Sequence, residues 1–434
     1  MRETAARCPG ISVIYAFTAS MLVFRHFTGS FCTPNFGYVP SFKQTRRQPK
    51  SDSQSHLWLV LQAGCALAAA MGIGRFVFTP ILPLMQAQAG VSAQTGADLA
   101  SANYIGYLLG ALIGIGIPRV SRSRFAARVA LVVLIASLVL MPVADASSVW
   151  FVLRLVAGVS SSVVFVVAVS SMLSGLAART RHLAGWGFGG VGAGILLSGI
   201  MIAVIRTAAT WQMAWWISAA VTFLLTATAW NLPAAKPDTA ALHSAPRPRT
   251  GKWFLALWTS YTLEGVGYII AGTFLVAAVQ VGGSGTIGSM VWIVVGAAAI
   301  PSSVLWTRLG RRWTRPTLLL VSLGVQAIGI ALPALFGGTA VALVAAGLFG
   351  ATFMGVSSLT LAIGDHLQTP RAVGLLTAGY SVGQILGPVV AAPLLGSGYN
   401  KAMILGSILV FAAAVAAALM CLRFPHELHS QPAR

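Results

Sequence analysis

The sequence predicts an all-α integral membrane protein of about twelve transmembrane helices in two six-helix halves. Three observations predict this class: the composition, the spacing of the apolar segments and a polar break in mid-chain. Of the 434 residues, 57% are hydrophobic and only 8% are charged, whereas soluble domains carry roughly 25% charged residues. A water-soluble fold of this length could not bury so much apolar surface. The chain is therefore expected to use the lipid bilayer as its solvent.

The apolar segments are long enough to cross a bilayer as helices, which takes about 20 residues. Helices satisfy their own backbone hydrogen bonds in lipid, and these segments lack the alternating hydrophobicity of β-barrel strands. Pro80 and Pro83 are expected to end the first segment, and Pro118 the second. The expected spans are residues 57–80, 98–118, 126–145, 148–173, 183–205, 212–232, 253–278, 286–306, 315–335, 339–363, 372–396 and 402–423.

A proline-rich, basic stretch between the sixth and seventh spans is typical of a flexible linker. At the N-terminus, Ile11–Phe24 is apolar but too short to span, and no small-residue cleavage site of a signal peptide is evident. We therefore expect this region to be disordered or to reflect a start codon assigned too early. The expected parts are an N-terminal extension (1–56), an N-terminal half (57–232), a cytoplasmic linker (233–252), a C-terminal half (253–423) and a cytoplasmic tail (424–434).

The basic residues fall on alternate loops. If the first span starts inside, the outer loops hold only Arg206 and Lys401. Cytoplasmic loops are enriched in Lys and Arg, so both termini are expected in the cytoplasm. The net charge of +20 then reflects topology, and nucleic-acid binding is not expected because the basic residues form no continuous face. The inner-loop residues are Arg119, Arg122, Arg124, Arg128, Arg179, Arg181, Lys236, Arg247, Arg249, Lys252, Arg308, Arg311, Arg312, Arg315 and Arg371.

Several blocks of sequence resemble one family of transporters. Gly72–Phe76 in the first span is similar to Gly265–Ile269 in the seventh span, and each block lies in the first span of its half. Two parallel six-helix repeats are typical of major facilitator transporters. With Ser101–Gly110 and Gly383–Pro388, these blocks make the chain resemble the major facilitator superfamily over residues 57–423, and within it the YbfB/YjiJ group. The resemblance implies the major facilitator fold, a transporter of the bacterial inner (plasma) membrane, and no particular substrate.

The cytoplasmic loop motif of that superfamily is partly present. In the loop after the eighth span, Ser303 and Thr307 replace its Gly and Asp, and Pro118 stands at the Asp position after the second span. The acids of the usual inter-helix charge lock are therefore missing, which leaves the fold prediction unchanged. The residues that match are Gly114, Arg119 and Arg122 for the second span and its loop, and Arg308, Gly310, Arg311 and Arg312 after the eighth.

Three charged residues lie inside predicted spans: Arg75, Arg154 and Glu264. A charge within the membrane is expensive and is a functional hypothesis by default. In the resembled fold, spans one, four, seven and ten line the central cavity, and all three charges fall on this set. Arg154–Gly158 also resembles the fourth-helix arginine motif that the superfamily links to proton coupling. The alternative for Arg154 is an arginine whose side chain reaches the outer membrane interface.

Glu264 is the only carboxylate expected near mid-bilayer. Burial favours a neutral carboxyl and a nearby arginine favours a charged one, so Glu264 is predicted to carry a proton, with Arg154 assisting. The alternative is a fixed ion pair with Arg75 or Arg154 that holds the halves together. An arginine left without a carboxylate would indicate an anionic substrate group or a backbone-carbonyl partner.

Polar side chains in the cavity-lining spans and in the second span are expected to bind substrate. Tyrosines also occur at membrane interfaces because their rings are amphipathic, and this alternative stays open. Asp365 and His366 end the tenth span and are expected to cap it or to pair with a loop arginine. The predicted substrate-binding residues are Arg75, Asn103, Tyr104, Tyr107, Tyr261 and Tyr268.

Glycines predict close helix packing in the fifth and eleventh spans. Gly187, Gly189 and Gly192 spell GxGxxG, but a dinucleotide site needs a βαβ unit that is not predicted here. Small residues instead allow membrane helices to approach closely. The matching face of the other half is expected to be Gly383, Gly387 and Pro388, with Gly379. Two such faces suit halves that rock during alternating access.

The expected function is secondary active transport of a small organic solute by alternating access, coupled to protons. No HExxH, GxSxG or GxxxxGK[ST] motif occurs, and the four cysteines form no CxxC pair, so neither an enzyme nor a cofactor nor a metal site is expected. The expected partners are a small-molecule substrate, the proton and the lipid bilayer, with the protein a monomer. The alternatives are a non-transporting membrane sensor or assembly subunit, and a membrane enzyme.

Overall fold

The structure is a computed structural model that describes residues 50–176, 180, 183–205, 210–235, 250–280, 285–369, 372–396, 398–422 and 424–425. Most of the predicted extension, linker and tail lies outside these residues. So do seven of the loop arginines and lysines: Arg179, Arg181, Arg206, Lys236, Arg247, Arg249 and Arg371. Every regular element in the described part of the chain is a helix, which confirms the all-α prediction.

Twelve helices are long and apolar enough to cross a membrane. The N-terminal half consists of α2 (Lys50–Leu67), the π-helix η2 (Ala68–Ile73), α3 (Phe78–Ala89), α4 (Ala93–Gly116), α5 (Pro118–Ser121), α6 (Arg124–Leu140), the 3₁₀ turn η3 (Met141–Val143), α7 (Ser147–Gly175), α8 (Ala184–Ile205) and α9 (Trp211–Ala229). The C-terminal half consists of α10 (Gly251–Gln280), α11 (Gly285–Leu309), α12 (Arg315–Leu335), α13 (Thr339–His366), α14 (Ala372–Leu395) and α15 (Tyr399–Cys421).

Hydroxyl side chains begin several of these helices. Ser92 Oγ accepts from the Thr95 amide at 3.0 Å before α4, and Ser123 Oγ accepts from the Ala126 amide at 3.2 Å before α6. Thr314 does the same before α12, at 3.4 Å. Such caps satisfy amides that have no partner inside the helix, and they set the residue at which each helix begins.

The first span differs from its prediction at both ends. Residues 50–56 were assigned to the disordered extension but form the first turns of α2, because nothing between Lys50 and Leu67 breaks a helix. Pro80 and Pro83 do not end the span, which continues through α3 to Ala89. Pro80 lies in the first turn of α3, where a helix needs no amide hydrogen. Both corrections lengthen the first span.

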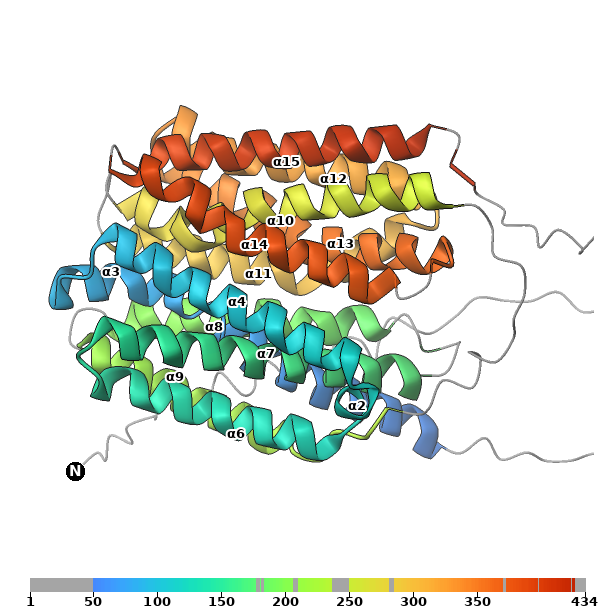
Figure 1. The fold of residues 1–434 in the computed structure, drawn as a ribbon, viewed down its shortest axis with the longest axis horizontal. Helices are drawn as coiled ribbons and strands as arrows, with labels where there is room; N and C mark the ends of the chain where they lie inside the picture. Colours follow the sequence, from blue (N-terminus) through green and yellow to red (C-terminus); the bar gives the residue numbers. More distant parts are fainter. Residues whose placement is uncertain are drawn as a thin grey trace, which may run out of the picture. The chain divides into compact units, whose positions relative to one another are not determined.

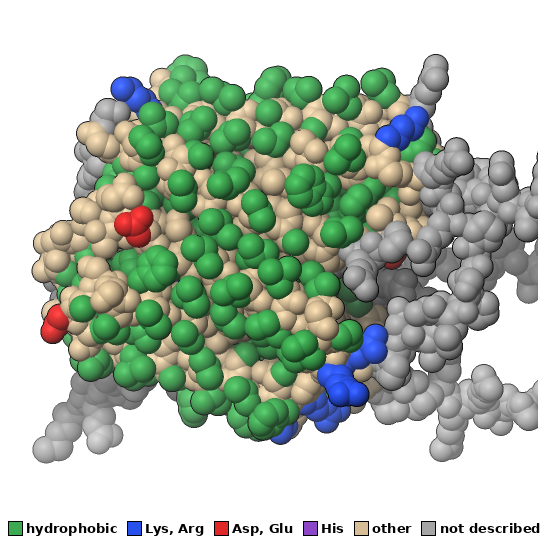
Figure 2. Space-filling model, viewed as in Figure 1, with side chains coloured by type: hydrophobic (Ala, Val, Ile, Leu, Met, Phe, Trp, Pro, Cys, Tyr) green, Lys and Arg blue, Asp and Glu red, His purple; other side chains and the backbone are tan. Residues whose placement is uncertain are grey.

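Residues 50–425 form a bundle in which each half gathers its own helices side by side (Figure 1). The halves meet where α4 packs on α14, α8 on α11 and α3 on α10. The start of α2 and the end of α15 lie at the same end of the bundle (Figure 1). In Figure 2, apolar side chains cover the flank, and most Lys and Arg gather toward that same end, whereas the acidic side chains in plain view lie toward the opposite end. We call these the basic end and the opposite end.

Glycines bring the helices into backbone contact, as predicted. A Cβ on Gly72 would lie 2.5 Å from Gly194 Cα on α8, and one on Gly192 would lie 2.5 Å from Ile300 N on α11. On α14, a Cβ on Gly387 would lie 2.8 Å from Val266 O, and one on Gly383 would collide with Thr262 O. Because these positions have no Cβ, α8 and α14 lie directly against their neighbours.

Candidate functional site

The first span is interrupted beside Arg75. The π-helix η2 ends at Ile73, and α3 begins only at Phe78. Thr79 donates its amide to Phe76 O at 3.2 Å, an i→i−3 bond that leaves Arg75 O without its usual helical donor. Irregular backbone at membrane depth is tolerated only where it is buried in protein or lines a cavity. The Gly72–Phe76 block therefore brings together, in the bundle interior, a charged side chain and a main-chain carbonyl that has no helical hydrogen-bond donor.

Arg154 on α7 binds the carbonyls of this interruption. Its Nη1 donates to Gly74 O at 3.3 Å and its Nη2 donates to Arg75 O at 3.2 Å. The Phe78 ring lies 4.8 Å from its guanidinium carbon, and the side chain is 2% exposed. Arg154 therefore does not reach the membrane interface. Its partner is the backbone, which was one of the two partners expected for an arginine without a carboxylate.

Asn103 on α4 holds Arg154 from the other side. Its Nδ2 donates to Arg154 O at 3.0 Å, and α4 and α7 approach so closely there that a Cβ on Gly158 would collide with Asn103 O. Asn103 was predicted to bind substrate. The structure places it in helix packing behind Arg154, although its own Oδ1 is buried without a partner.

Arg75 lies between the two halves. Its Nη2 donates to Gln384 Oε1 on α14 at 2.5 Å, across the interface. The rings of Tyr107 and Tyr104 lie 4.1 and 4.9 Å from its guanidinium carbon, and the ring of Phe76 lies 5.4 Å away. The side chain is 2% exposed. A desolvated cation–π contact contributes about 2 kcal/mol, so the three rings and the hydrogen bond to Gln384 offset much of the several kcal/mol that burying an ion costs. None of these partners carries a negative charge.

Two further hydrogen bonds cross between the halves near Arg75. The hydroxyls of Tyr104 and Thr273 lie 3.0 Å apart, and Thr79 Oγ1 donates to Gly272 O at 2.7 Å. Both residue pairs are buried. The site is thus built by α3, α4 and η2 from one half and by α10 and α14 from the other.

Glu264 on α10 is completely buried and lies in the C-terminal half. Its Oε1 accepts from Gln326 Nε2 on α12 at 3.2 Å, while Oε2 has no hydrogen-bond partner. In the described structure neither Arg75 nor Arg154 contacts it. The alternative of a fixed Glu–Arg ion pair is therefore wrong for this arrangement: both arginines have other partners, and the partner of the acid is a neutral amide.

Aromatic rings of the C-terminal half pack in a continuous series next to Arg75. Tyr261 stacks on Tyr380 with centroids 4.3 Å apart, and Tyr268 stacks on Tyr380 at 5.9 Å and on Phe353 at 4.9 Å. Phe353 then meets Phe76 edge-on at 5.7 Å. The predicted residues Tyr261 and Tyr268 are buried in the bundle, where their rings face other helices.

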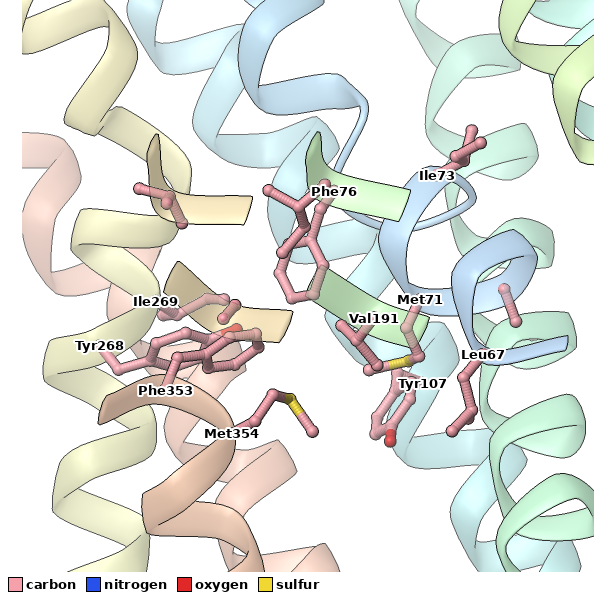
Figure 3. Packing of buried hydrophobic residues seen from close by; sticks show 14 of the residues in the cluster. Leu67, Met71, Ile73, Phe76, Tyr107, Val191, Tyr268, Ile269, Phe353 and Met354 are labelled. Atoms are coloured by element: carbon pink, nitrogen blue, oxygen red, sulfur yellow. The ribbon is translucent and has the colours of Figure 1, made fainter. Parts of the chain in front are cut away.

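Figure 3 shows how these aromatic rings of the C-terminal half face the N-terminal half. Tyr268, Phe353 and Met354 lie on one side, Met71 and Tyr107 lie on the other, and Phe76 projects between them. Sequence reasoning missed Tyr380 and Phe353, as well as the two amides Gln384 and Gln326. The only signal for the amides was a polar residue in an otherwise apolar span, which is weaker than a charge.

The remaining predicted positions lie in the loops, on α14 and at the end of α13. Gly310 and the loop arginines Arg119, Arg122, Arg308, Arg311 and Arg312 are exposed. Gly383, Gly387 and Pro388 are buried on α14. His366 Nε2 lies 2.9 Å from Pro425 O in the segment after α15, which is neither the cap nor the loop-arginine pair expected for it. Over the described ranges, no group of three or more His, Cys, Asp or Glu side chains could hold a metal ion.

Two six-helix halves that enclose a buried polar centre form the architecture of a secondary transporter. The chain belongs to the major facilitator superfamily: a family model described as "Uncharacterised MFS-type transporter YbfB" matches residues 67–418. This confirms the resemblance inferred from the sequence. A crystal structure of a point mutant of the nucleoside transporter NupG has a similar fold, with a TM-score of 0.65 and 14% identity over 84% of this chain and 100% of that chain. No curated protein matches the sequence.

Proposed function

We propose that this protein is a proton-coupled secondary active transporter that moves a small organic solute by alternating access. The observation that carries the proposal is the Arg75–Gln384 hydrogen bond, which is buried between two halves that meet over small residues. A charged side chain at that position is retained against a large desolvation cost. Substrate contacts are expected from Arg75, Tyr104, Tyr107, Tyr261 and Tyr268.

Glu264 is proposed as the proton carrier. Its partner Gln326 has both a donor and an acceptor, so the amide can donate to a carboxylate or accept from a carboxylic acid. The free atoms Glu264 Oε2 and Gln326 Oε1 are both buried without partners. The same amide can therefore pair with either protonation state of Glu264, but only the protonated state is buried without the cost of an unpaired charge. Arg154 contributes to coupling indirectly, since it holds the broken backbone that carries Arg75.

The proposed orientation puts the basic end in the cytoplasm of a bacterial cell, with both termini inside and the protein a monomer in the inner membrane. The positive-inside rule supports it. Arg119, Arg122 and Arg308 are exposed, and the start of α2 and the end of α15 lie at the basic end.

The test compares small molecules inside and outside cells that overproduce the wild type, Glu264→Gln or Asp98→Asn at equal membrane levels. Asp98 is the matched control, because it is an exposed carboxylate that accepts only from Gln94, at 3.1 Å. We expect one solute class to shift with the wild type and Asp98→Asn, in proportion to an imposed pH gradient, and not with Glu264→Gln. Undiminished pH-driven transport by Glu264→Gln would contradict proton carriage. No shift in any strain would contradict transport and favour a sensor.

A further inference from the structure

Arg75 has hydrogen-bonding capacity that the protein does not use. Its Nε and Nη1 atoms are buried and have no hydrogen-bond partner, and together they carry three N–H bonds. Nη2 is bonded to the neutral amide of Gln384, and the Tyr107 hydroxyl also interacts with the guanidinium. Buried polar groups in proteins are almost always paired, so unused donors on a buried cation point to a ligand that supplies acceptors.

The charge balance of the centre also lacks an anion. Both amino groups of the Arg154 guanidinium are bound to backbone carbonyls. Glu264, the buried carboxylate among the described residues, is bonded to Gln326 and contacts neither arginine. Arg75 is therefore a desolvated cation whose surroundings are a neutral amide and aromatic rings. A ligand that carries a negative charge would complete this environment.

The surroundings of Arg75 further indicate what the anion is attached to. The Phe76 ring lies beside the guanidinium and meets Phe353 edge-on, and Phe353 stacks on Tyr268. Met71 and Met354 flank the same region (Figure 3). Flat rings and flexible thioethers accommodate a planar apolar body. A hydrated inorganic anion would find too few donors here to replace its water.

We propose that the transported solute is a small organic anion, a monocarboxylate with a body of one or two rings, whose carboxylate binds Arg75. The body would lie against Phe76, Phe353 and Tyr268. Guanidinium and carboxylate are planar and match in hydrogen-bond geometry, which favours a carboxylate over a spherical anion. This inference rests on the proposed transport function and specifies its substrate class.

Binding can be measured on the purified full chain in detergent, as ligand-dependent thermal stabilisation. The probes are benzoate, phenylacetate and naphthoate, with benzamide as the neutral isostere of benzoate and chloride as the inorganic anion at equal ionic strength. The variants are Arg75→Gln, Arg75→Lys and, as the matched control, the exposed Arg312→Gln. We expect at least one carboxylate to stabilise the wild type and Arg312→Gln, with benzamide and chloride ineffective. Loss of a charged hydrogen-bond partner should weaken binding by roughly ten- to a hundredfold in Arg75→Gln.

Arg75→Lys keeps the charge but loses the planar fork, so it should bind the carboxylate more weakly than the wild type and serves if Arg75→Gln does not fold. Equal stabilisation by benzamide or by chloride would overturn the inference, as would unchanged carboxylate binding in both Arg75 variants or no stabilisation by any carboxylate. If cells exchange a neutral or cationic solute only with the wild type, while no carboxylate binds, transport stands and the anion inference fails.

Discussion

Gly72→Ala should separate the first span from α8 next to the functional site. The added Cβ would lie 2.5 Å from Gly194 Cα and 2.7 Å from Val191 O, against 3.4–4 Å for ordinary contact. Reaching 3.4 Å from 2.5 Å requires about 0.9 Å of movement, and both obstructing atoms belong to backbone. The far side of α8 offers no room, because a Cβ on Gly192 would already lie 2.5 Å from Ile300 N.

Overpacking of this kind costs about 1–3 kcal/mol, and the confinement of α8 on both sides favours the upper part of that range. For a chain of this size, the unfolding midpoint should fall by roughly 1–4 °C. The displaced segment carries Gly74 and Arg75, whose carbonyls bind Arg154. Transport should therefore fall more steeply than stability.

The assay is thermal unfolding of purified protein in detergent, followed by tryptophan fluorescence, beside transport at equal membrane levels. Gly324→Ala is the matched control, because a Cβ there meets nothing within 4 Å and Gly324 lies inside α12. That substitution should be neutral or stabilise by up to about 1 kcal/mol, since alanine favours helix. The reasoning would be refuted if Gly72→Ala unfolded at the wild-type temperature or above, or if both variants lost stability equally.

Three further variants test other contacts of the site. Arg154→Met leaves two buried carbonyls unpaired and should lower stability by about 2 kcal/mol and abolish transport; wild-type unfolding and activity would contradict its role as backbone clamp. Thr79→Val removes the hydrogen bond to Gly272 O, which contributes about 1 kcal/mol. In a Leu275→Cys background, where position 275 is normally 1% exposed, the rate of labelling by an impermeant thiol reagent should therefore rise roughly fivefold. An unchanged labelling rate would mean that this hydrogen bond does not hold the halves together. Gln326→Leu should slow pH-driven transport roughly tenfold by removing the partner of Glu264; an unaffected initial rate would contradict this.

The features that could be predicted from the sequence are those with the largest transfer free energies between water and lipid. A span of about 20 apolar residues and a charge inside it are both unmistakable in lipid, and on this basis the helices and the three buried charges were found. The close packing of α8 and α14 was also predictable, because many glycines in one membrane span indicate that a neighbouring helix approaches closely.

Other features depended on partners distant in sequence. Gln384 and Gln326 cost far less to bury than a charge, so their positions alone did not distinguish them from packing residues. Arg154 was predicted to act on protons or to reach the interface, because the broken backbone at Gly74 and Arg75 that it binds is a tertiary feature. Pro80 and Pro83 were assigned as helix ends because sequence alone does not show that α3 restarts just before them.

The two proposals together explain why proton and solute would move together. In this structure, Glu264 and Arg75 are both buried and do not neutralise each other. Closing the halves without ligands buries a negative and a positive charge separately, and each costs several kcal/mol. A proton on Glu264 removes the first cost, and a carboxylate on Arg75 removes the second. With only one ligand bound, one of the two costs remains and opposes closure, whereas the carrier with both closes readily. The closing step is then favoured when proton and solute are both bound, with no direct contact between the proton site and the solute site.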